Sequence, residues 1–403
     1  MRDDGTGGDA VAGDGVYSAT IGGRSSGTLV GFTISATDAS TSAPPATASF
    51  PVAWIPFPRP ATECLVRWDD PIPAGNFAHY HLWSSSSTEA LRGGSTALNN
   101  TYREATLAYG NFRVIYQVGF RDKGSPYHGG AGSFALTNPD DQPLLGTSDR
   151  VFRCTGNGGS ESTGFRNSLC AWIGGQLGIP YLHTHYMQLY RNGGSQYNVW
   201  QDAEAPSGYY ADSWFPSSSP GDFYKIAIWF EFQDDNSNFG STSATLEDFR
   251  RPDGKTNVMR YRWNWQTRGY NGTANDFSNI LRLVALANDT TTSFVPNLLR
   301  DVDADEWMRI FAYHRVLGNW DSYAYSVGQN MYLLKRPDSK YVLMPWDIDF
   351  TLGDGAGASD GLWGGQDPII NRWFDTPALR RMLWRGFIDA VNGPLDRSEE
   401  HTS

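Results

Sequence analysis

The chain has 403 residues, enough for two or three domains and a large hydrophobic core. Its formal net charge of −11 disfavours a nucleic-acid partner, which binds basic surfaces, and no apolar run is long enough to span a bilayer. Charged residues make up only 19% and aromatic residues 14%, a composition that favours a secreted or cell-surface protein over a cytosolic enzyme.

Residues 1–52 are predicted to be mainly β-structure. The runs 16–21 and 29–36 have strand-like composition and are separated by turns of Gly and Ser. They are too few for a complete β-sandwich, so we interpret 1–52 as the C-terminal part of an immunoglobulin-like or fibronectin-like module, followed by a linker at 53–63.

Acidic residues among glycines near the start leave two interpretations open, a calcium site and a solvated turn. These residues are Asp3, Asp4, Asp9 and Asp14. Their spacing fits no calcium-loop rule, so the solvated turn is the preferred interpretation.

Both ends of the chain are predicted to be cut. The sequence starts in the middle of a predicted loop, and its first residues do not show the charged and then apolar pattern of a secretion leader. Residues 397–403 correspond to one reading frame of a common sequencing-adapter oligonucleotide, and we interpret them as non-native. We therefore expect the chain to be a fragment of a longer secreted protein.

A glycine-rich turn is the first candidate for ligand binding. The predicted strand 111–120 leads into a turn that carries Arg121, Lys123 and Ser125, and the chain returns at 133–136. Backbone amides and cations in such a turn can face nucleotide phosphates, which makes these three residues candidate nucleotide ligands. The pattern alone is weak, because most glycine-rich hairpins are only hairpins.

Two later elements carry further candidates. A helix is predicted over 163–177, with Thr163 as its cap and an apolar stripe that includes Phe165 and Trp172. The Arg166-Asn167 pair at its start resembles an Arg-Asn element of the CotH family, identified below from longer motifs; the resemblance implies that Arg166 orients metal or phosphate, and a role only in starting the helix is equally open. On the strand that begins at Asp222, the Tyr224-Lys225 pair resembles a Leu-Tyr-Lys element of the same family, which makes Lys225 a candidate phosphate or carboxylate partner, with a surface lysine as the alternative.

A helix and a hairpin form the centre of the second half of the chain. Asp303 and Glu306 have the spacing of a capping box, and an apolar stripe follows them. After this helix, the runs 331–335 and 341–345 flank a Pro-Asp-Ser turn and are predicted to pair antiparallel.

Acidic and amide side chains flank this predicted hairpin. Asp321 and Asn330 precede it, and Asp347 and Asp349 follow it. A hairpin brings its outer ends together, so we expect these four residues to converge at one end of the sheet. Their oxygen atoms suit a hard divalent cation, and their order resembles that of the base and the metal ligands of a protein kinase.

Three pieces of this stretch resemble the CotH family of spore-coat-type secreted atypical kinases. They are Gly318-Asn319-Trp320-Asp321, Asn330-Met331-Tyr332-Leu333 and Pro345-Trp346-Asp347-Ile348-Asp349. The resemblance implies an α+β fold with a bilobal, kinase-like domain at 64–396, cut at its C-terminal end and preceded by the partial β-sandwich segment. One departure is Ala135, where many relatives have Lys or Arg; Lys123 or Arg121 is the expected substitute.

The resemblance further implies ATP- and Mg²⁺- or Mn²⁺-dependent phosphoryl transfer to a Ser or Thr of a protein acceptor. Asp321 is the candidate base, and Asn330, Asp347 and Asp349 are the candidate metal ligands. Two other functions remain open. Ala135 and the scarcity of lysine favour an inactive kinase-like binding module, and paired carboxylates beside tryptophans are compatible with a carbohydrate-active protein.

Overall fold

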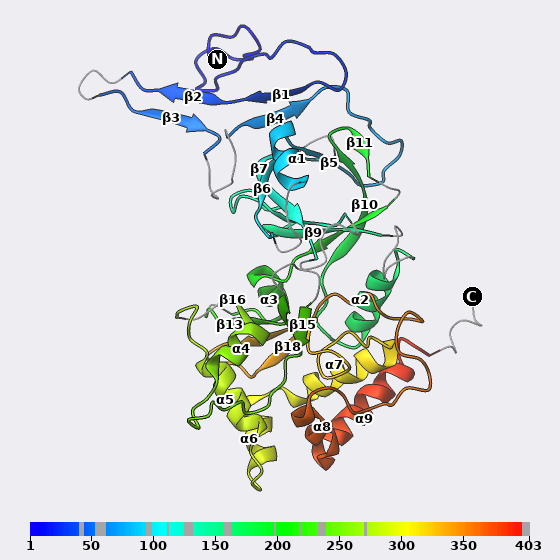
Figure 1. Cartoon of the computed structure of the whole chain (residues 1–403). Coiled ribbons are helices and arrows are strands. Elements are labelled where there is room, and N and C mark those ends of the chain that lie inside the picture. Colours follow the sequence, from blue (N-terminus) through cyan, green and yellow to red (C-terminus); the bar gives the residue numbers. More distant parts are fainter. Residues whose placement is uncertain are drawn as a thin grey trace. The chain divides into compact units, whose positions relative to one another are not determined.

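The computed structural model describes residues 1–39, 44–52, 62–93, 99–110, 113–124, 132–155, 163–196, 199–217, 219–232, 239–269 and 272–396. Contacts divide the chain into two compact units, whose elements are labelled in Figure 1. Unit 1 comprises Met1–Arg121, Leu136–Gln142 and Met187–Asn198. Unit 2 comprises Asp122–Ala135, Pro143–Tyr186 and Val199–Ser403. Most of the predicted linker and the whole predicted tail lie outside the described residues.

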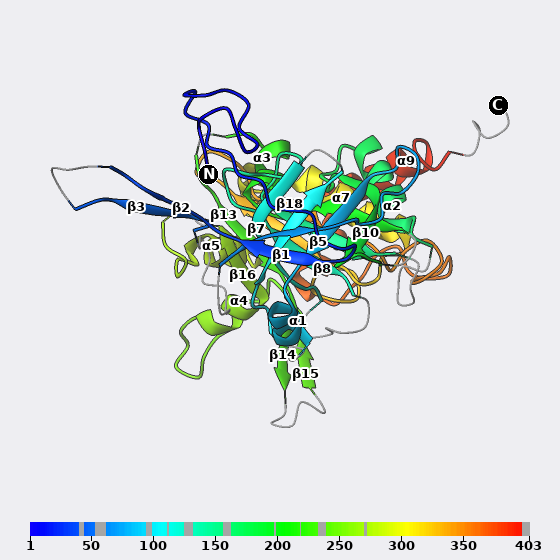
Figure 2. The ribbon, with the colours of Figure 1, turned by 90° about the horizontal axis from the view of Figure 1, so that it is seen from above.

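The N-terminal part of unit 1 contains shorter strands than the sequence predicts. Strand β1 (Leu29–Phe32) pairs with β4 (Cys64–Arg67), whereas β2 (Ile34–Thr37) pairs with β3 (Thr47–Phe50) and extends as a ribbon (Figure 2). The strand predicted at 29–36 is confirmed in position but is divided in two, because the chain changes its pairing partner between β1 and β2. The strand predicted at 16–21 is also wrong; its apolar side chains are exposed and one isolated bridge forms there.

A larger sheet has the strand order β11-β10-β12-β9-β8-β7-β6-β5. Its strands are β5 (His79–Trp83), β6 (Arg103–Tyr109), β7 (Arg113–Asp122), β8 (Phe134–Thr137), β9 (Asp149–Cys154), β10 (Thr184–Arg191), β11 (Gly194–Ser195) and β12 (Trp200–Glu204). Because β10 also pairs with β5 in parallel, the strands from β5 to β10 close into a barrel. The sequence analysis did not predict this closure, which joins segments far apart in the chain.

A smaller antiparallel sheet in unit 2 has the order β16-β13-β17-β18. Its strands are β13 (Asp222–Ile226), β16 (Trp265–Gly269), β17 (Met331–Lys335) and β18 (Val342–Pro345). The predicted hairpin is confirmed, since β17 and β18 pair with Met331 opposite Pro345. Strands β14 (Trp229–Phe232) and β15 (Phe239–Thr242) form a separate ribbon.

Helices surround this small sheet within unit 2. They are α2 (Arg166–Gln176), α3 (Gly208–Trp214), α4 (Val258–Asn264), α5 (Ser278–Ala287), α6 (Phe294–Asp301), α7 (Ala304–Leu317), α8 (Pro368–Asp375) and α9 (Pro377–Val391), while α1 (Ser86–Gly93) belongs to unit 1. Among the described residues, no helix is both long and apolar enough to cross a membrane.

Helix α7 ends just before Asp321, the candidate base. The predicted capping box forms only in part: Asp303 Oδ1 accepts the Glu306 N–H at 3.3 Å, but the Asp303 N–H donates to the Tyr341 carbonyl and the Glu306 carboxylate accepts from Leu343. The apolar side chains of α7 are buried in the main core of unit 2. Helix α9 lies beside α7 (Figure 1), where a Cβ on Gly386 would stand 2.8 Å from the Ala312 Cβ, so the close approach requires glycine. Gly318, at φ 70°, ends the helix.

Helix α2 buries only part of the predicted apolar stripe, of which Ile173 is 2% exposed. Phe165 and Trp172 are 55% and 53% exposed, while the smaller residues Asn167 and Cys170 are buried. Tyr313 of α7 packs closely against the buried face, since its hydroxyl donates to the Cys170 carbonyl at 2.7 Å and would stand 3.4 Å from a Cβ on Gly174.

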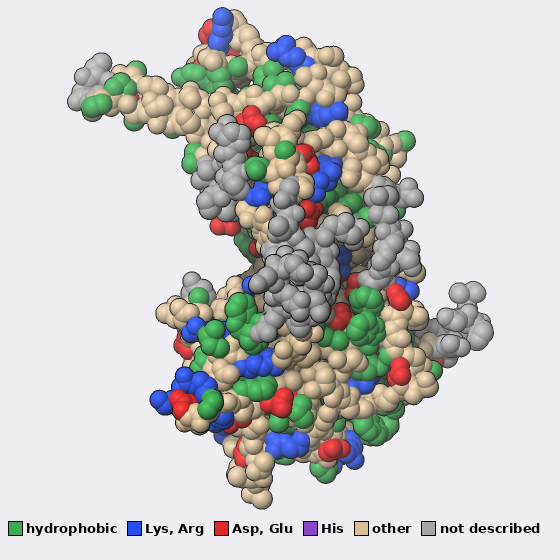
Figure 3. Space-filling model, viewed as in Figure 1, with side chains coloured by type: hydrophobic (Ala, Val, Ile, Leu, Met, Phe, Trp, Pro, Cys, Tyr) green, Lys and Arg blue, Asp and Glu red, His purple; other side chains and the backbone are tan. Residues whose placement is uncertain are grey.

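The visible surface carries charges of both signs. On the face in Figure 3, Lys and Arg side chains are interspersed with Asp and Glu, and the described residues of that face form no broad basic patch.

Candidate active site

The outer ends of the β17–β18 hairpin lie together in unit 2. The Trp346 N–H donates to the Asn330 carbonyl at 3.2 Å, directly beyond the last strand pair. Asn330 and Asp347 both have left-handed backbones, with φ of 57° and 54°. Asn and Asp adopt this conformation more readily than other residues that carry a side chain, so the two residue types suit these turns.

Asn330 holds Asp321 in place. Its Nδ2 donates to the Asp321 carbonyl at 2.8 Å and to Oδ2 at 2.9 Å, and Gln329 Nε2 donates to Oδ1. Burial raises the pKa of Asp321; repulsion from Asp347 raises it further, whereas the hydrogen bonds from Gln329 and Asn330 oppose the shift. The result is a fixed carboxylate that is more basic than an exposed one.

Asp347 is surrounded by cations. Lys123 Nζ lies 3.2 Å from both of its carboxylate oxygens, and Arg153 Nη2 lies 3.2 Å from Oδ1. Burial alone would raise the pKa of Asp347, but the charges of Lys123, Arg153 and Lys225 lower it to about 2. Asp347 is therefore ionised at any physiological pH.

The aromatic ring next to Asp347 supports both cations. Lys123 Nζ and Arg153 Cζ lie 5.1 and 4.9 Å from the centre of the Trp346 ring, which is 6% exposed. Arg153 Nη1 also donates to Asn167 Oδ1 on α2 at 2.5 Å. Trp346 is thus a buried support for the cations and is not available as an exposed platform for a sugar ring.

Arg153 is a site residue that the sequence analysis missed. It lies on β9, the neighbour of the β8 strand that carries the buried Ala135. A signal was present, since Arg150 and Arg153 flank the apolar pair Val151-Phe152 of a short strand, and charged residues are rarely buried unless they are paired. Arg153 supplies the cation that Ala135 does not.

Two further predicted ligands, Lys225 and Arg166, also belong to unit 2. Lys225, on β13 opposite Tyr332 of β17, contributes to the low pKa of Asp347. Arg166 Nη1 pairs with Asp354 Oδ2 at 2.9 Å, in the loop that follows the candidate metal ligands.

The remaining predicted ligands do not join this group in the described residues. Arg121 belongs to unit 1, where it donates to Asn100 at 2.9 Å and lies over the Tyr102 ring. Ser125 and most of the glycine-rich turn lie outside the described residues. Of that predicted turn, Lys123 is the residue that the structure brings to Asp347.

The three candidate acidic residues are less tightly grouped than the sequence suggests. Within the described part of the chain, Asp321, Asp347 and Asp349 do not form a set with ligand atoms within 4.8 Å of one another. Asp349 is half-buried, two residues beyond Asp347. Mg²⁺ commonly uses one or two protein carboxylates together with phosphate oxygens, so such a set is not required for a nucleotide-bound metal.

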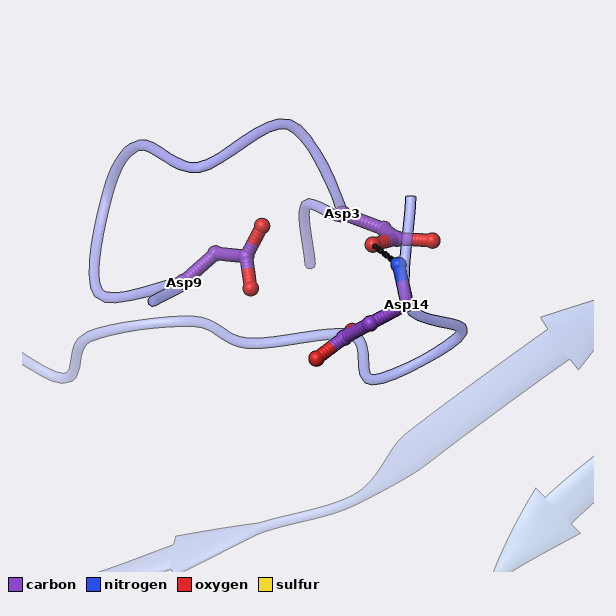
Figure 4. A group of neighbouring side chains, drawn as sticks. All are labelled: Asp3, Asp9 and Asp14. Carbon is purple, nitrogen blue, oxygen red and sulfur yellow. Dashed lines mark hydrogen bonds between the residues drawn. The ribbon is translucent and has the colours of Figure 1, made fainter. Parts of the chain in front are cut away.

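The N-terminal acidic residues form a tighter group. Asp3, Asp9 and Asp14 each place an oxygen within 4.8 Å of the others (Figure 4). Their carboxylates also organise the loop, because Asp3 accepts the Gly13 N–H at 2.8 Å and Asp9 accepts the Gly5 N–H at 2.6 Å. These backbone bonds organise the loop without an ion and are compatible with the solvated turn, the preferred interpretation; calcium binding there stays the alternative prediction.

Comparison with known families supports the kinase-like interpretation of the acidic hairpin. A family model described as CotH kinase protein matches residues 132–399, which include the whole hairpin and Arg153. No curated protein matches the chain.

Proposed function

Because the chain belongs to the CotH kinase protein family, we propose that it transfers the terminal phosphoryl group of ATP to a Ser or Thr of a protein acceptor. One observation carries this proposal. A buried, amide-bound carboxylate, Asp321, stands beside a second carboxylate, Asp347, that is bound to two cations. Phosphoryl transfer requires such a base together with charges that can bind metal and phosphate.

The residues around Asp347 fit a divalent metal and a nucleotide. Asp347, Asp349 and Asn330 offer the oxygen donors that Mg²⁺ and Mn²⁺ prefer. The amide nitrogen of Asn330 is used by Asp321, so its carbonyl oxygen is the atom that would face a metal. Arg153 Nε is buried without a hydrogen-bond partner in the structure, an unused donor of the kind that phosphate oxygens satisfy.

Each residue has a defined role in this proposal. A bound Mg²⁺ or Mn²⁺ would neutralise charge on the phosphates. Asp321 accepts the proton of the acceptor hydroxyl, and its raised pKa makes it a better base. Gln329 and Asn330 keep its carboxylate in one orientation. Lys123, Arg153 and Lys225 supply positive charge for the phosphates, and Arg166 and Arg121 are further candidates.

An inactive binding module is the second candidate function. The observation that favours it is Ala135, which is buried on β8 and offers no charge to a phosphate. Arg153 on the adjacent strand weakens this argument, because it places a cation at Asp347. The two candidates differ in whether the folded protein transfers phosphate.

We further infer that residues 64–396 form a bilobal kinase-like domain and that residues 1–52 are part of an immunoglobulin-like module. The composition, poor in charged residues and rich in aromatic ones, supports a secreted or cell-surface location. Spore-coat proteins are one setting that the family name suggests.

Replacement of Asp321 tests the proposed reaction. Asp321→Ala removes the base but leaves the cations and the metal ligands in place, so we expect ATP binding to change less than about threefold and transfer to fall at least about 100-fold. Phosphate incorporation into a mixture of acceptor proteins and ATP binding by calorimetry are the two measurements. Asp375→Asn, an exposed carboxylate on α8, is the matched control. Undiminished transfer by Asp321→Ala would remove Asp321 from the mechanism.

A further inference from the structure

Lys123 and Asp347 form an ion pair at the place where the proposed function requires a metal. Both carboxylate oxygens of Asp347 lie 3.2 Å from Lys123 Nζ. The two side chains are 20% and 26% exposed, so water and small ions can reach the pair. An ammonium group and a divalent cation repel each other, and they cannot both remain on the same two oxygens.

The second cation at Asp347 is held more firmly than Lys123. The Arg153 side chain is 9% exposed, bonds Asn167 on α2 and lies over Trp346. Lys123 follows directly after β7, and its ammonium group is carried on a flexible four-carbon chain. When ligand enters, Lys123 is therefore the cation that can move, while Arg153 stays.

Resting on the proposed function, we propose that Lys123 exchanges between two partners. It occupies Asp347 in the nucleotide-free protein and transfers to the phosphates when nucleotide and metal bind together. Nucleotide phosphates attract the ammonium group, and its departure frees the Asp347 oxygens for the metal. Lys123 thereby keeps metal alone off the site and makes the binding of metal and nucleotide cooperative.

If Lys123 only bound phosphate, its replacement would weaken nucleotide binding and leave metal binding unchanged. The proposed exchange predicts an effect on both affinities. Removal of the Lys123 charge takes a competitor away from the metal, so metal alone should bind more tightly. The same change takes a partner away from the phosphates, so nucleotide should bind more weakly. The two affinities should move in opposite directions by about fivefold each, the size expected for one partly exposed charge pair.

The experiment uses the full chain and measures binding only. Mn²⁺ affinity is determined by electron paramagnetic resonance, and the affinity for a non-hydrolysable ATP analogue is determined by calorimetry at saturating Mn²⁺. Wild type is compared with Lys123→Gln and with Lys123→Arg, which keeps the charge and should resemble wild type. Lys255→Gln removes an exposed charge in another loop of unit 2 and is the matched control.

The outcomes separate the exchange from the proposed function. Tighter Mn²⁺ binding and weaker nucleotide binding in Lys123→Gln, with both unchanged in Lys255→Gln, support the exchange. Equal or weaker Mn²⁺ binding in Lys123→Gln overturns it, even where wild type binds metal and nucleotide as the proposed function requires. Absence of metal-dependent nucleotide binding in folded wild type overturns both.

Discussion

The charge cluster at Asp347 makes a quantitative prediction for Asp347→Asn. The pKa of Asp347 falls from 3.8 to about 2 in the folded protein, which corresponds to about 2 kcal/mol of unfolding free energy at neutral pH. The variant keeps the side-chain volume, and Asn tolerates the left-handed backbone at φ 54° at least as well as Asp. The loss therefore reflects charge, because Lys123 and Arg153 remain without their shared partner.

The stabilisation by ionised Asp347 should decrease as the pH falls. Since the folded-state pKa lies below the unfolded-state value, the stabilisation is complete above about pH 5, roughly half remains at pH 3, and it disappears below pH 2. The difference between wild type and Asp347→Asn should shrink over the same range.

Urea unfolding is the suitable assay, because urea does not screen ion pairs as guanidinium salts do. Asp354→Asn is the matched control, since the Asp354 side chain is 45% exposed and its pair with Arg166 should contribute less than about 1 kcal/mol. A variant as stable as wild type at pH 7, or a difference that stays constant down to pH 3, would refute the electrostatic account of this cluster.

Two further predictions concern buried carboxyl groups. Asp367→Ala should lower the unfolding free energy by about 3 kcal/mol in urea, because Asp367 caps α8 and accepts the Leu246 N–H and the Tyr323 hydroxyl at 2.9 and 2.8 Å; a loss below about 1 kcal/mol would contradict this role. Burial raises the pKa of Glu306 well above its usual value, and Leu343 N–H donates to it at 3.2 Å. The wild type should therefore lose stability as pH rises above about 4.5, the ordinary pKa of the group, and Glu306→Gln should not lose it in this way; parallel profiles would be inconsistent with a neutral Glu306.

The parts of the site that local signals specify could be predicted from the sequence. The Asp303 cap fixes the start of α7, and the Pro-Asp-Ser turn fixes the register of β17 and β18. Together they place Asp321, Asn330 and Asp347 in one region, because a short hairpin has few alternative geometries.

The parts that depend on long-range contacts could not be predicted. Lys123 and Asp347 are 224 residues apart, and nothing in either neighbourhood selects the other. Arg153 reaches Asp347 because β9 joins a sheet whose closure depends on pairing between β5 and β10. The buried face of α2 could be predicted only in part for a similar reason, since Tyr313, which contacts it at Cys170, is 143 residues away in the chain.

The most direct test of the central claim is a calorimetric titration of ATP with Mg²⁺ or Mn²⁺, on wild type and on Asp349→Asn. Asp349 is a candidate metal ligand, and its replacement by Asn removes one negative charge at nearly constant volume. Our account predicts binding by wild type that requires the metal and weakens at least about tenfold in the variant. Metal-independent binding, or no binding by folded wild type, would contradict it.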